Sequence, residues 1–183
     1  MDSAQPIMLL LAGPNGAGKT TVSEYILDTG VVSRFINADT IAKGLTSGSD
    51  AAADVEAGRI MILAVEEAIE ARESFSLETT LSGRNWLKHI ARAKELGFRV
   101  EVWYVKVDSP ETAISRVQER AAKGGHFVEA GVIRRRFERS WRNLCEDYRH
   151  LAEQWYLFDN TGGRAVMVGT GGQADMVPGC ENG

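Results

Sequence analysis

A glycine-rich loop between an apolar run and a helical segment constrains this chain more than any other feature. Residues 7–12 are all apolar, which is typical of a short strand buried on both faces of a parallel sheet. A helix is predicted to begin at Thr20, directly after the loop. The residues from Gly13 to Thr20 have the spacing G-x-x-x-x-G-K-[ST], and in this strand–loop–helix context the spacing indicates a phosphate-binding loop.

The chemistry of such a loop explains its residue types. Glycines let backbone N–H groups close around phosphate oxygens, and the helix N-terminus adds the positive end of its dipole. The Lys19 ammonium would reach the β and γ phosphates, and the Thr20 hydroxyl would be a ligand of Mg²⁺. A chance glycine-rich turn would explain neither side chain, so the sequence predicts a site for ATP or GTP with Mg²⁺. The predicted nucleotide-binding residues are Gly13, Pro14, Asn15, Gly16, Ala17, Gly18, Lys19, Thr20 and Thr21.

Strand and helix patterns alternate along the rest of the chain. Strands are predicted over residues 7–12, 34–37, 74–78, 100–107 and 155–158, and helices over 20–28, 51–72, 85–96, 111–122 and 131–152. This alternation predicts an α/β fold with a doubly wound parallel sheet of about five strands. We expect one domain over residues 1–161, followed by a glycine-rich tail over 162–183 with at most a short strand near 165–168 and otherwise loose chain.

Composition narrows the function classes. The 183 residues carry a formal net charge of -4, so nothing in the overall charge favours nucleic acid as a partner. The two cysteines, Cys145 and Cys180, are unevenly placed and predict neither a disulfide framework nor a metal-ligand pair, which fits a reducing compartment. The apolar run 7–12 is too short for a signal sequence or a membrane span, so a soluble cytoplasmic protein is expected.

Two acidic residues are predicted at the carboxyl ends of neighbouring strands. Substrates of open parallel sheets bind beyond these ends, so Asp39 and Glu78 should both face the phosphate loop. Asp39 is placed to orient an acceptor hydroxyl and take its proton, and Glu78 with Thr79 and Thr80 could hold acceptor hydroxyls or a metal-bound water. The alternatives are a helix N-cap for Asp39 and an exposed strand-end residue for Glu78. Asp108, which precedes a Ser-Pro pair, fits a cap or turn better than a metal ligand.

Arginines gather between residues 116 and 142, where eight basic residues accompany three acidic ones. A cationic helix–loop–helix beside a phosphate site predicts a lid whose arginines offset charge on the γ-phosphate, with Gly124-Gly125 as a hinge. The alternative is a solvated arginine face or a weak RNA-binding patch. His126, beside the hinge, fits a loop hydrogen-bonding residue better than a catalyst.

These motifs together resemble the zeta-toxin-like group of P-loop kinases, especially its small stand-alone members. The Glu-Thr-Thr element of residues 78–80 and the Gly-Gly-His and Arg-Arg-aromatic elements are the most specific parts of the resemblance. The matching stretches are residues 12–21, 35–39, 57–59, 75–82, 124–128, 133–140 and 143–144. The chain departs from the pattern at Glu129, where a proline is expected after Val128, and in its C-terminal tail.

The resemblance implies roles for individual residues. Lys19 and Thr20 would serve nucleotide and metal, Asp39 would be the base and Glu78 would contact the acceptor. Arg120 and Arg135 would contact phosphates. For the toxin branch it further implies a nucleotide-sugar acceptor such as UDP-N-acetylglucosamine and an antitoxin-type protein partner.

Two functions therefore remain open from the sequence. The first is a kinase that moves a phosphoryl group to a small-molecule acceptor. The second is a nucleotide-dependent ATPase or binding module whose basic segment holds RNA or a protein partner. Base stacking with RNA uses aromatic side chains, and few of these lie near the arginines. This scarcity favours the kinase.

Overall fold

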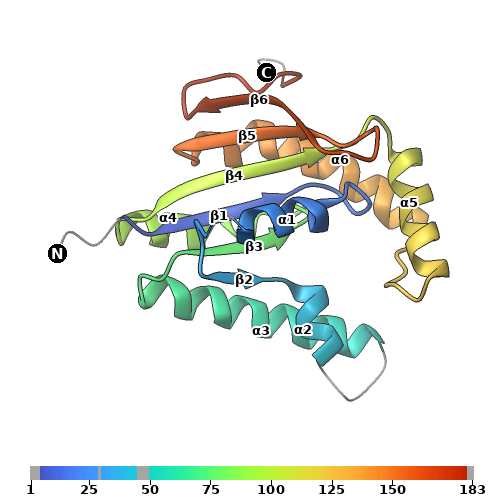
Figure 1. The fold of residues 1–183 in the computed structure, drawn as a ribbon. Helices are drawn as coiled ribbons and strands as arrows, with labels where there is room; N and C mark the ends of the chain where they lie inside the picture. Colours follow the sequence, from blue (N-terminus) through green and yellow to red (C-terminus); the bar gives the residue numbers. More distant parts are fainter. Residues whose placement is uncertain (1–4, 29, 45–49, 181–183) are drawn as a thin grey trace.

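The computed structural model describes residues 5–28, 30–44 and 50–180, which form one six-stranded sheet flanked by helices (Figure 1). The strand order is β2-β3-β1-β4-β5-β6. The strands are β1 (Ile7–Ala12), β2 (Arg34–Ile36), β3 (Phe75–Thr79), β4 (Arg99–Lys106), β5 (Gln154–Asp159) and β6 (Val166–Gly172). The helices are α1 (Lys19–Asp28), α2 (Ala38–Gly44), α3 (Asp50–Glu70), α4 (Leu87–Glu95), α5 (Pro110–Ala122) and α6 (Ala130–Glu146), followed by a short 3-10 turn, η1 (Tyr148–His150).

Strand β1 lies at the centre of the sheet because its side chains are apolar on both faces. It pairs in parallel with β3 on one side and β4 on the other. Alternate residues of β1 enter two separate cores: Met8 and Leu10 pack with α3, α4 and α6, whereas Leu9 and Leu11 pack with α1. The predicted α/β class with a parallel sheet is confirmed, since β1 to β5 all run parallel.

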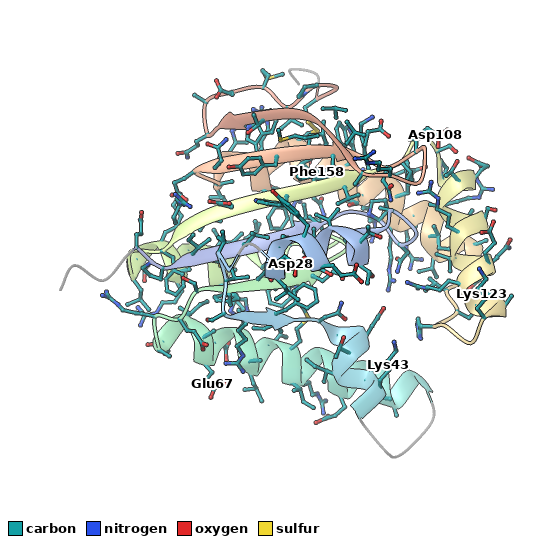
Figure 2. All side chains as sticks on the ribbon, viewed as in Figure 1. Asp28, Lys43, Glu67, Asp108, Lys123 and Phe158 are labelled. Carbon is teal, nitrogen blue, oxygen red and sulfur yellow. A yellow bond between two sulfur atoms is a disulfide. The ribbon has the colours of Figure 1, made fainter. Side chains whose placement is uncertain are left out.

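Helices α5 and α6 form a hairpin, in which α5 lies beyond the carboxyl ends of the strands and the second half of α6 packs against the sheet (Figure 1). Asp108 lies at the sheet end of α5 and Lys123 at its far end (Figure 2). Ser109 caps α5 by accepting a hydrogen bond from the Thr112 N–H at 3.2 Å, and Pro110 is the first helical residue, as the sequence predicts. The α5–α6 hairpin packs on its own small apolar cluster, which includes Val117 and Ile133.

The glycine-rich tail differs from its prediction. Instead of a short strand and loose chain, residues 166–172 form a full sixth strand that pairs antiparallel with β5. Gly171 lies across the indole ring of Trp155, where an added Cβ would come within 2.6 Å of the ring. The tail then returns over the core and buries Val177 and Cys180. The tail is therefore ordered because it covers the apolar side chain of Trp155, although its own sequence has no helical or strand period. Its last residues, 181–183, lie outside the described residues.

Cys145 and Cys180 are joined by a disulfide, and the prediction that they form none is wrong. Cys145 lies near the end of α6, and the tail passes directly over it, so the two Cα atoms are 5.4 Å apart. Uneven spacing in the sequence gave no sign of this contact because the fold alone creates it.

Among the described helices, none combines the length and apolar character that a membrane span requires.

We expect reduction of this disulfide to lower the free energy of unfolding without abolishing the fold, because β6 and Val177 keep their contacts. The bond joins residues separated by 35 positions, for which chain entropy predicts a loss of about 4 kcal/mol. Urea denaturation with and without dithiothreitol measures the loss. The Cys180→Ser variant is the control and should not respond to reductant, whereas an unchanged midpoint for the reduced parent protein would contradict the expectation.

Candidate functional site

The phosphate loop follows β1 and leads directly into α1, as the sequence predicts. Gly13 and Gly18 adopt φ angles of 141° and 87°. A Cβ on Gly13 would lie 2.2 Å from the Val105 carbonyl oxygen, and one on Gly18 would lie 2.1 Å from the Asn160 side-chain nitrogen. Only glycine fits these two positions. The buried Asn160 amide, at the end of β5, also donates to the Ala17 carbonyl at 2.8 Å and so fixes the loop from the neighbouring strand.

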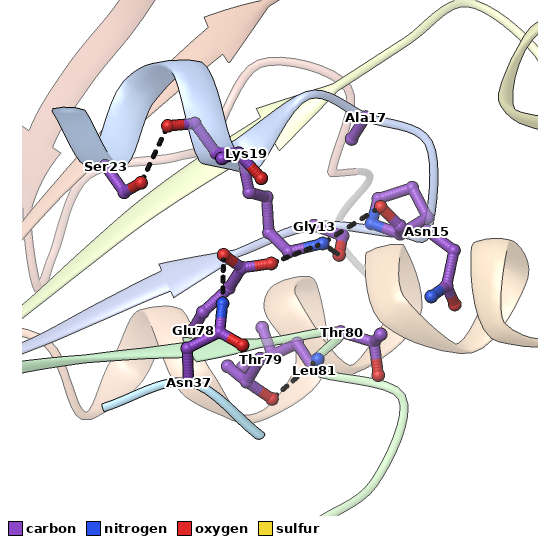
Figure 3. Close-up of polar contacts among 12 residues, drawn as sticks. Gly13, Asn15, Ala17, Lys19, Ser23, Asn37, Glu78, Thr79, Thr80 and Leu81 are labelled. Atoms are coloured by element: carbon purple, nitrogen blue, oxygen red, sulfur yellow. Dashed lines mark hydrogen bonds and ion pairs between the residues drawn. The ribbon is translucent and has the colours of Figure 1, made fainter. Parts of the chain in front are cut away.

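The Lys19 ammonium lies at the centre of the site (Figure 3). Its Nζ donates to the carbonyl oxygens of Gly13 at 3.0 Å and Pro14 at 3.2 Å, and it lies 3.6 Å from Glu78 Oε1. The residue is only 7% exposed. Burial lowers the pKa of Lys19, whereas the nearby carboxylates of Glu78 and Asp39 raise it. Oxygen atoms thus surround the cation, and phosphate oxygens of a bound nucleotide could take the place of the two loop carbonyls.

Glu78 reaches the loop because β3 pairs with β1 and places it beside Leu11. Its Oε2 accepts a hydrogen bond from Asn37 Nδ2 at 2.8 Å (Figure 3). Asn37 also caps α2, since its Oδ1 accepts from the Thr40 N–H at 3.1 Å. The sequence assigned no role to Asn37, although an Asn directly before a helix start is a capping signal. This cap leaves the Asp39 carboxylate in the first turn of α2, exposed and not engaged as the helix N-cap.

Two cavities meet at this point, one of about 600 Å³ and one of about 330 Å³. Both are lined by the same four residues, Asn15, Lys19, Asp39 and Glu78. The smaller cavity is also lined by the phosphate loop, by two arginines of α5 and by the end of β5: Gly16, Gly18, Thr20, Arg116, Arg120 and Asn160. The larger is also lined by the end of β3 and the loop after it, by the loop between α5 and α6, and by α6: Thr79, Thr80, Ser82, Trp86, His126 and Arg136.

The predicted site residues thus divide between the two cavities. The structure brings together Lys19, Asp39 and Glu78, with Thr20 and Arg120 on one side and Thr79 and Thr80 on the other. Thr21, one residue further along α1, is exposed and lines neither cavity. Asp108 also lies outside both and accepts a hydrogen bond from the Ser109 hydroxyl at 3.4 Å.

The three consecutive arginines of α6 have three different surroundings. Arg136 donates to Asn15 Oδ1 in the phosphate loop at 3.1 Å. Arg134 pairs with Glu111 on the surface. Arg135 is exposed and lines neither cavity, so the structure does not bring it to the site.

The rotation of α6 explains this division. Its buried residues Ile133 and Ser140 mark the face that turns inward. Arg136 is three residues after the first and four before the second, so it lies on that face, whereas Arg135 is turned away. In the sequence, only the apolar residues Ile133 and Leu144 on this face could have pointed to Arg136.

Oxygen donors suit the smaller cavity to a hard cation. The described residues contain no group of three His, Cys, Asp or Glu side chains arranged to hold a metal. Thr20, Asp39 and Glu78 all line the smaller cavity. A hydroxyl and carboxylates that act together with substrate phosphates are the ligands Mg²⁺ takes in phosphoryl-transfer sites.

A family model described as zeta toxin matches residues 1–167. The chain belongs to the zeta toxin family. The resemblance predicted from the sequence is therefore confirmed. A protein of Haemophilus influenzae described as uncharacterized is 32% identical over 129 residues, which are 70% of this chain and 91% of that protein. As a zeta toxin family member with this loop and sheet, the chain is a P-loop phosphotransferase that uses a nucleotide, and the prediction of an enzyme is confirmed.

Solved structures share the fold at lower identity. A structure from the PezAT chromosomal toxin-antitoxin system of Streptococcus pneumoniae has a TM-score of 0.69 at 16% identity, over 98% of this chain and 77% of that one. A structure of AvrRxo1-ORF1:-ORF2 with ATP has a TM-score of 0.67 at 19% identity, over 92% of this chain and 59% of that one. At these identities the two structures show that the fold is shared.

Replacement of single arginines by lysine tests the α6 surroundings in this zeta toxin family member. Lysine keeps the charge but loses the planar two-pronged donor group. From the geometry we expect Arg136→Lys to lower kcat at least about tenfold, because Arg136 contacts the phosphate loop. Steady-state kinetics of ATP turnover measures the effect.

Arg135→Lys is the matched comparison on the same helix, because the sequence-based prediction gives the phosphate contact to Arg135. A large loss of kcat for Arg135→Lys with little effect of Arg136→Lys would support that prediction and contradict the geometry. The kcat of Arg120→Lys should also fall, by an amount similar to that of whichever α6 variant replaces a phosphate-contacting arginine.

Proposed function

We propose that the chain transfers the γ-phosphoryl group of ATP or GTP, with Mg²⁺, to a hydroxyl of a small acceptor. The observation that carries the proposal is the shared wall of the two cavities. The smaller cavity adjoins the phosphate loop and suits a nucleotide triphosphate, and the larger one, at about 600 Å³, has room for an acceptor. Both cavities are lined by Lys19, Asp39 and Glu78, so the phosphoryl group would pass from nucleotide to acceptor beside these side chains.

On the nucleotide side, the chain supplies positive charge at several points. Lys19 would exchange the carbonyls of Gly13 and Pro14 for phosphate oxygens, and Arg116 and Arg120 line the same cavity. Bound Mg²⁺ would offset negative charge on the phosphates, with Thr20 as the ligand that the chain contributes. Preorganised charges of this kind supply a large share of the rate enhancement in phosphoryl transfer.

On the acceptor side, Asp39 is the proposed base. Its carboxylate is exposed at the start of α2 and lines both cavities. As the acceptor oxygen forms its bond to the γ phosphorus and the bond to the bridging oxygen of the nucleotide breaks, the acceptor proton passes to Asp39. Glu78, Thr79 and Thr80 would hold the acceptor, and Glu78 additionally keeps Lys19 in place.

Nucleotide sugars such as UDP-N-acetylglucosamine are the first acceptors to test, on the strength of the family. We also propose a protein partner of the antitoxin type, since the PezAT relative comes from a toxin-antitoxin system. The second candidate function is a nucleotide-dependent ATPase or binding module. It is favoured by one observation, the exposed arginines 135, 139 and 142 of α6, which could face RNA or a protein.

Incubation with a polar metabolite extract and Mg-ATP tests the proposal. Mass spectrometry should detect at least one metabolite that gains one phosphate, and UDP-N-acetylglucosamine is assayed separately. The Lys19→Ala variant should remain folded and lose turnover by orders of magnitude, because its ammonium stabilises the transferring group. Hydrolysis of ATP without any phosphorylated metabolite would favour the ATPase alternative.

The role of Asp39 is tested by the isosteric change Asp39→Asn. An amide cannot take the acceptor proton, so kcat should fall on the order of 10²–10⁴-fold. The dissociation constant of the Mg-nucleotide, measured by calorimetry, should stay close to the parent value. A parallel loss of Mg-dependent nucleotide binding would instead make Asp39 a metal-shell residue.

A further inference from the structure

The loop between β3 and α4 forms one wall of the larger cavity. Thr80, Ser82 and Trp86 line that cavity together with Thr79 at the end of β3. The Thr80 and Ser82 hydroxyls are hydrogen-bonded to each other at 2.9 Å. The Trp86 indole donates to Thr79 Oγ1 at 3.1 Å. An ordered set of hydroxyls and one aromatic side chain therefore faces the space proposed for the acceptor.

This arrangement depends on an uncommon backbone conformation at Leu81. Its φ angle is +56°, in the left-handed region, which is unfavourable for a residue with a side chain. The side chain of Leu81 is buried, and the residue is 1% exposed. The left-handed residue turns the chain between Thr80 and Ser82, and their hydroxyls meet.

Side chains hold both backbone polar groups of Leu81. Its N–H donates to Thr79 Oγ1 at 3.1 Å (Figure 3). Its carbonyl oxygen accepts from Asn143 Nδ2 at 2.8 Å, in a buried hydrogen bond that joins residues far apart in the sequence. Asn143 belongs to α6 and is only 6% exposed. A buried carbonyl that lost this donor would be left without a hydrogen-bond partner, which is unfavourable.

The same loop is attached to the end of α6 at two further points. The Tyr148 hydroxyl donates to the Gly83 carbonyl at 2.8 Å, and burial raises the pKa of Tyr148 to about 12. Arg84 forms ion pairs with Glu146 at 3.2 Å and Asp147 at 2.7 Å. Of these contacts, the Asn143 hydrogen bond is the buried one that acts directly on the left-handed residue.

We infer that Asn143 is a positioning residue for the acceptor: by holding the Leu81 carbonyl it fixes the hydroxyls of Thr80 and Ser82 at the larger cavity. The inference rests on the proposed function, because it needs that cavity to take the acceptor. It assigns to α6 two separate tasks, since Arg136 contacts the phosphate loop and Asn143 sets the opposite wall.

The Asn143→Leu variant tests the inference, because leucine keeps the branched shape of the asparagine side chain but has no group that can donate to the Leu81 carbonyl. With the polar metabolite extract and Mg-ATP, the ratio of phosphorylated metabolite to free phosphate should fall at least about tenfold, while release of free phosphate stays within about twofold of the parent. Hydrogen exchange of the amides in residues 79–86 should be faster than in the parent.

Ser140→Ala is the matched control on the same helix. Ser140 is fully buried and shares a 2.8 Å hydrogen bond with Tyr104 of β4, away from the loop. This variant should lose stability, with the product ratio and exchange over residues 79–86 unchanged. If Asn143→Leu does not fold, Tyr148→Phe takes its place, since it removes the Gly83 hydrogen bond and should shift both readouts in the same direction by less.

The outcomes separate this inference from the proposed function. If the parent phosphorylates a metabolite and Asn143→Leu does so at the parent ratio, the positioning role is overturned. Unchanged exchange over residues 79–86 overturns it as well. If the parent itself yields no phosphorylated metabolite, the proposed function fails, and the acceptor role of Asn143 fails with it.

Discussion

The buried ammonium of Lys19 is the interaction on which the site depends. A cation taken out of water is costly unless oxygen atoms surround it, and here two loop carbonyls and Glu78 do so. Their positions require the tight turn at Gly13 and the parallel pairing of β1 with β3. The central sheet, the phosphate loop and Glu78, near the end of β3, are thus held together by these contacts.

Helix α6 connects this unit to the rest of the molecule. Arg136, at its first half, contacts the phosphate loop, and Asn143, at its second half, contacts the loop after β3. Near its end, Cys145 fixes the C-terminal tail. Buried contacts of Ser140 and Leu144 hold the second half of α6 against the core. This half therefore anchors α5 and the first half of α6 to the sheet.

The parts of the site that the sequence predicts are those set by local pattern. The phosphate loop is contiguous, and Asp39 and Glu78 lie at or just beyond the ends of strands whose carboxyl ends share one edge of the sheet, so the three meet as expected. The arginine triplet was harder, because the choice between Arg135 and Arg136 depends on how α6 rotates against the core. The roles of all these residues in catalysis stay predictions.

Long-range contacts explain the remaining differences. The disulfide of Cys145 and Cys180 and the sixth strand arise only when the tail covers Trp155, and no periodicity in the tail signals this. The hydrogen bond from Asn143 to Leu81 joins residues 62 positions apart, and its purpose is visible only beside the left-handed backbone that it holds.

The most direct test of the central claim is a crystal structure of the protein with Mg²⁺ and a non-hydrolysable ATP analogue. We expect the phosphates to lie in the smaller cavity against the loop of residues 13–20, with the γ-phosphate beside Asp39 and Glu78 and in contact with the Lys19 ammonium. An analogue bound elsewhere, or a Lys19 that stays on the carbonyls of Gly13 and Pro14 without touching phosphate, would contradict it.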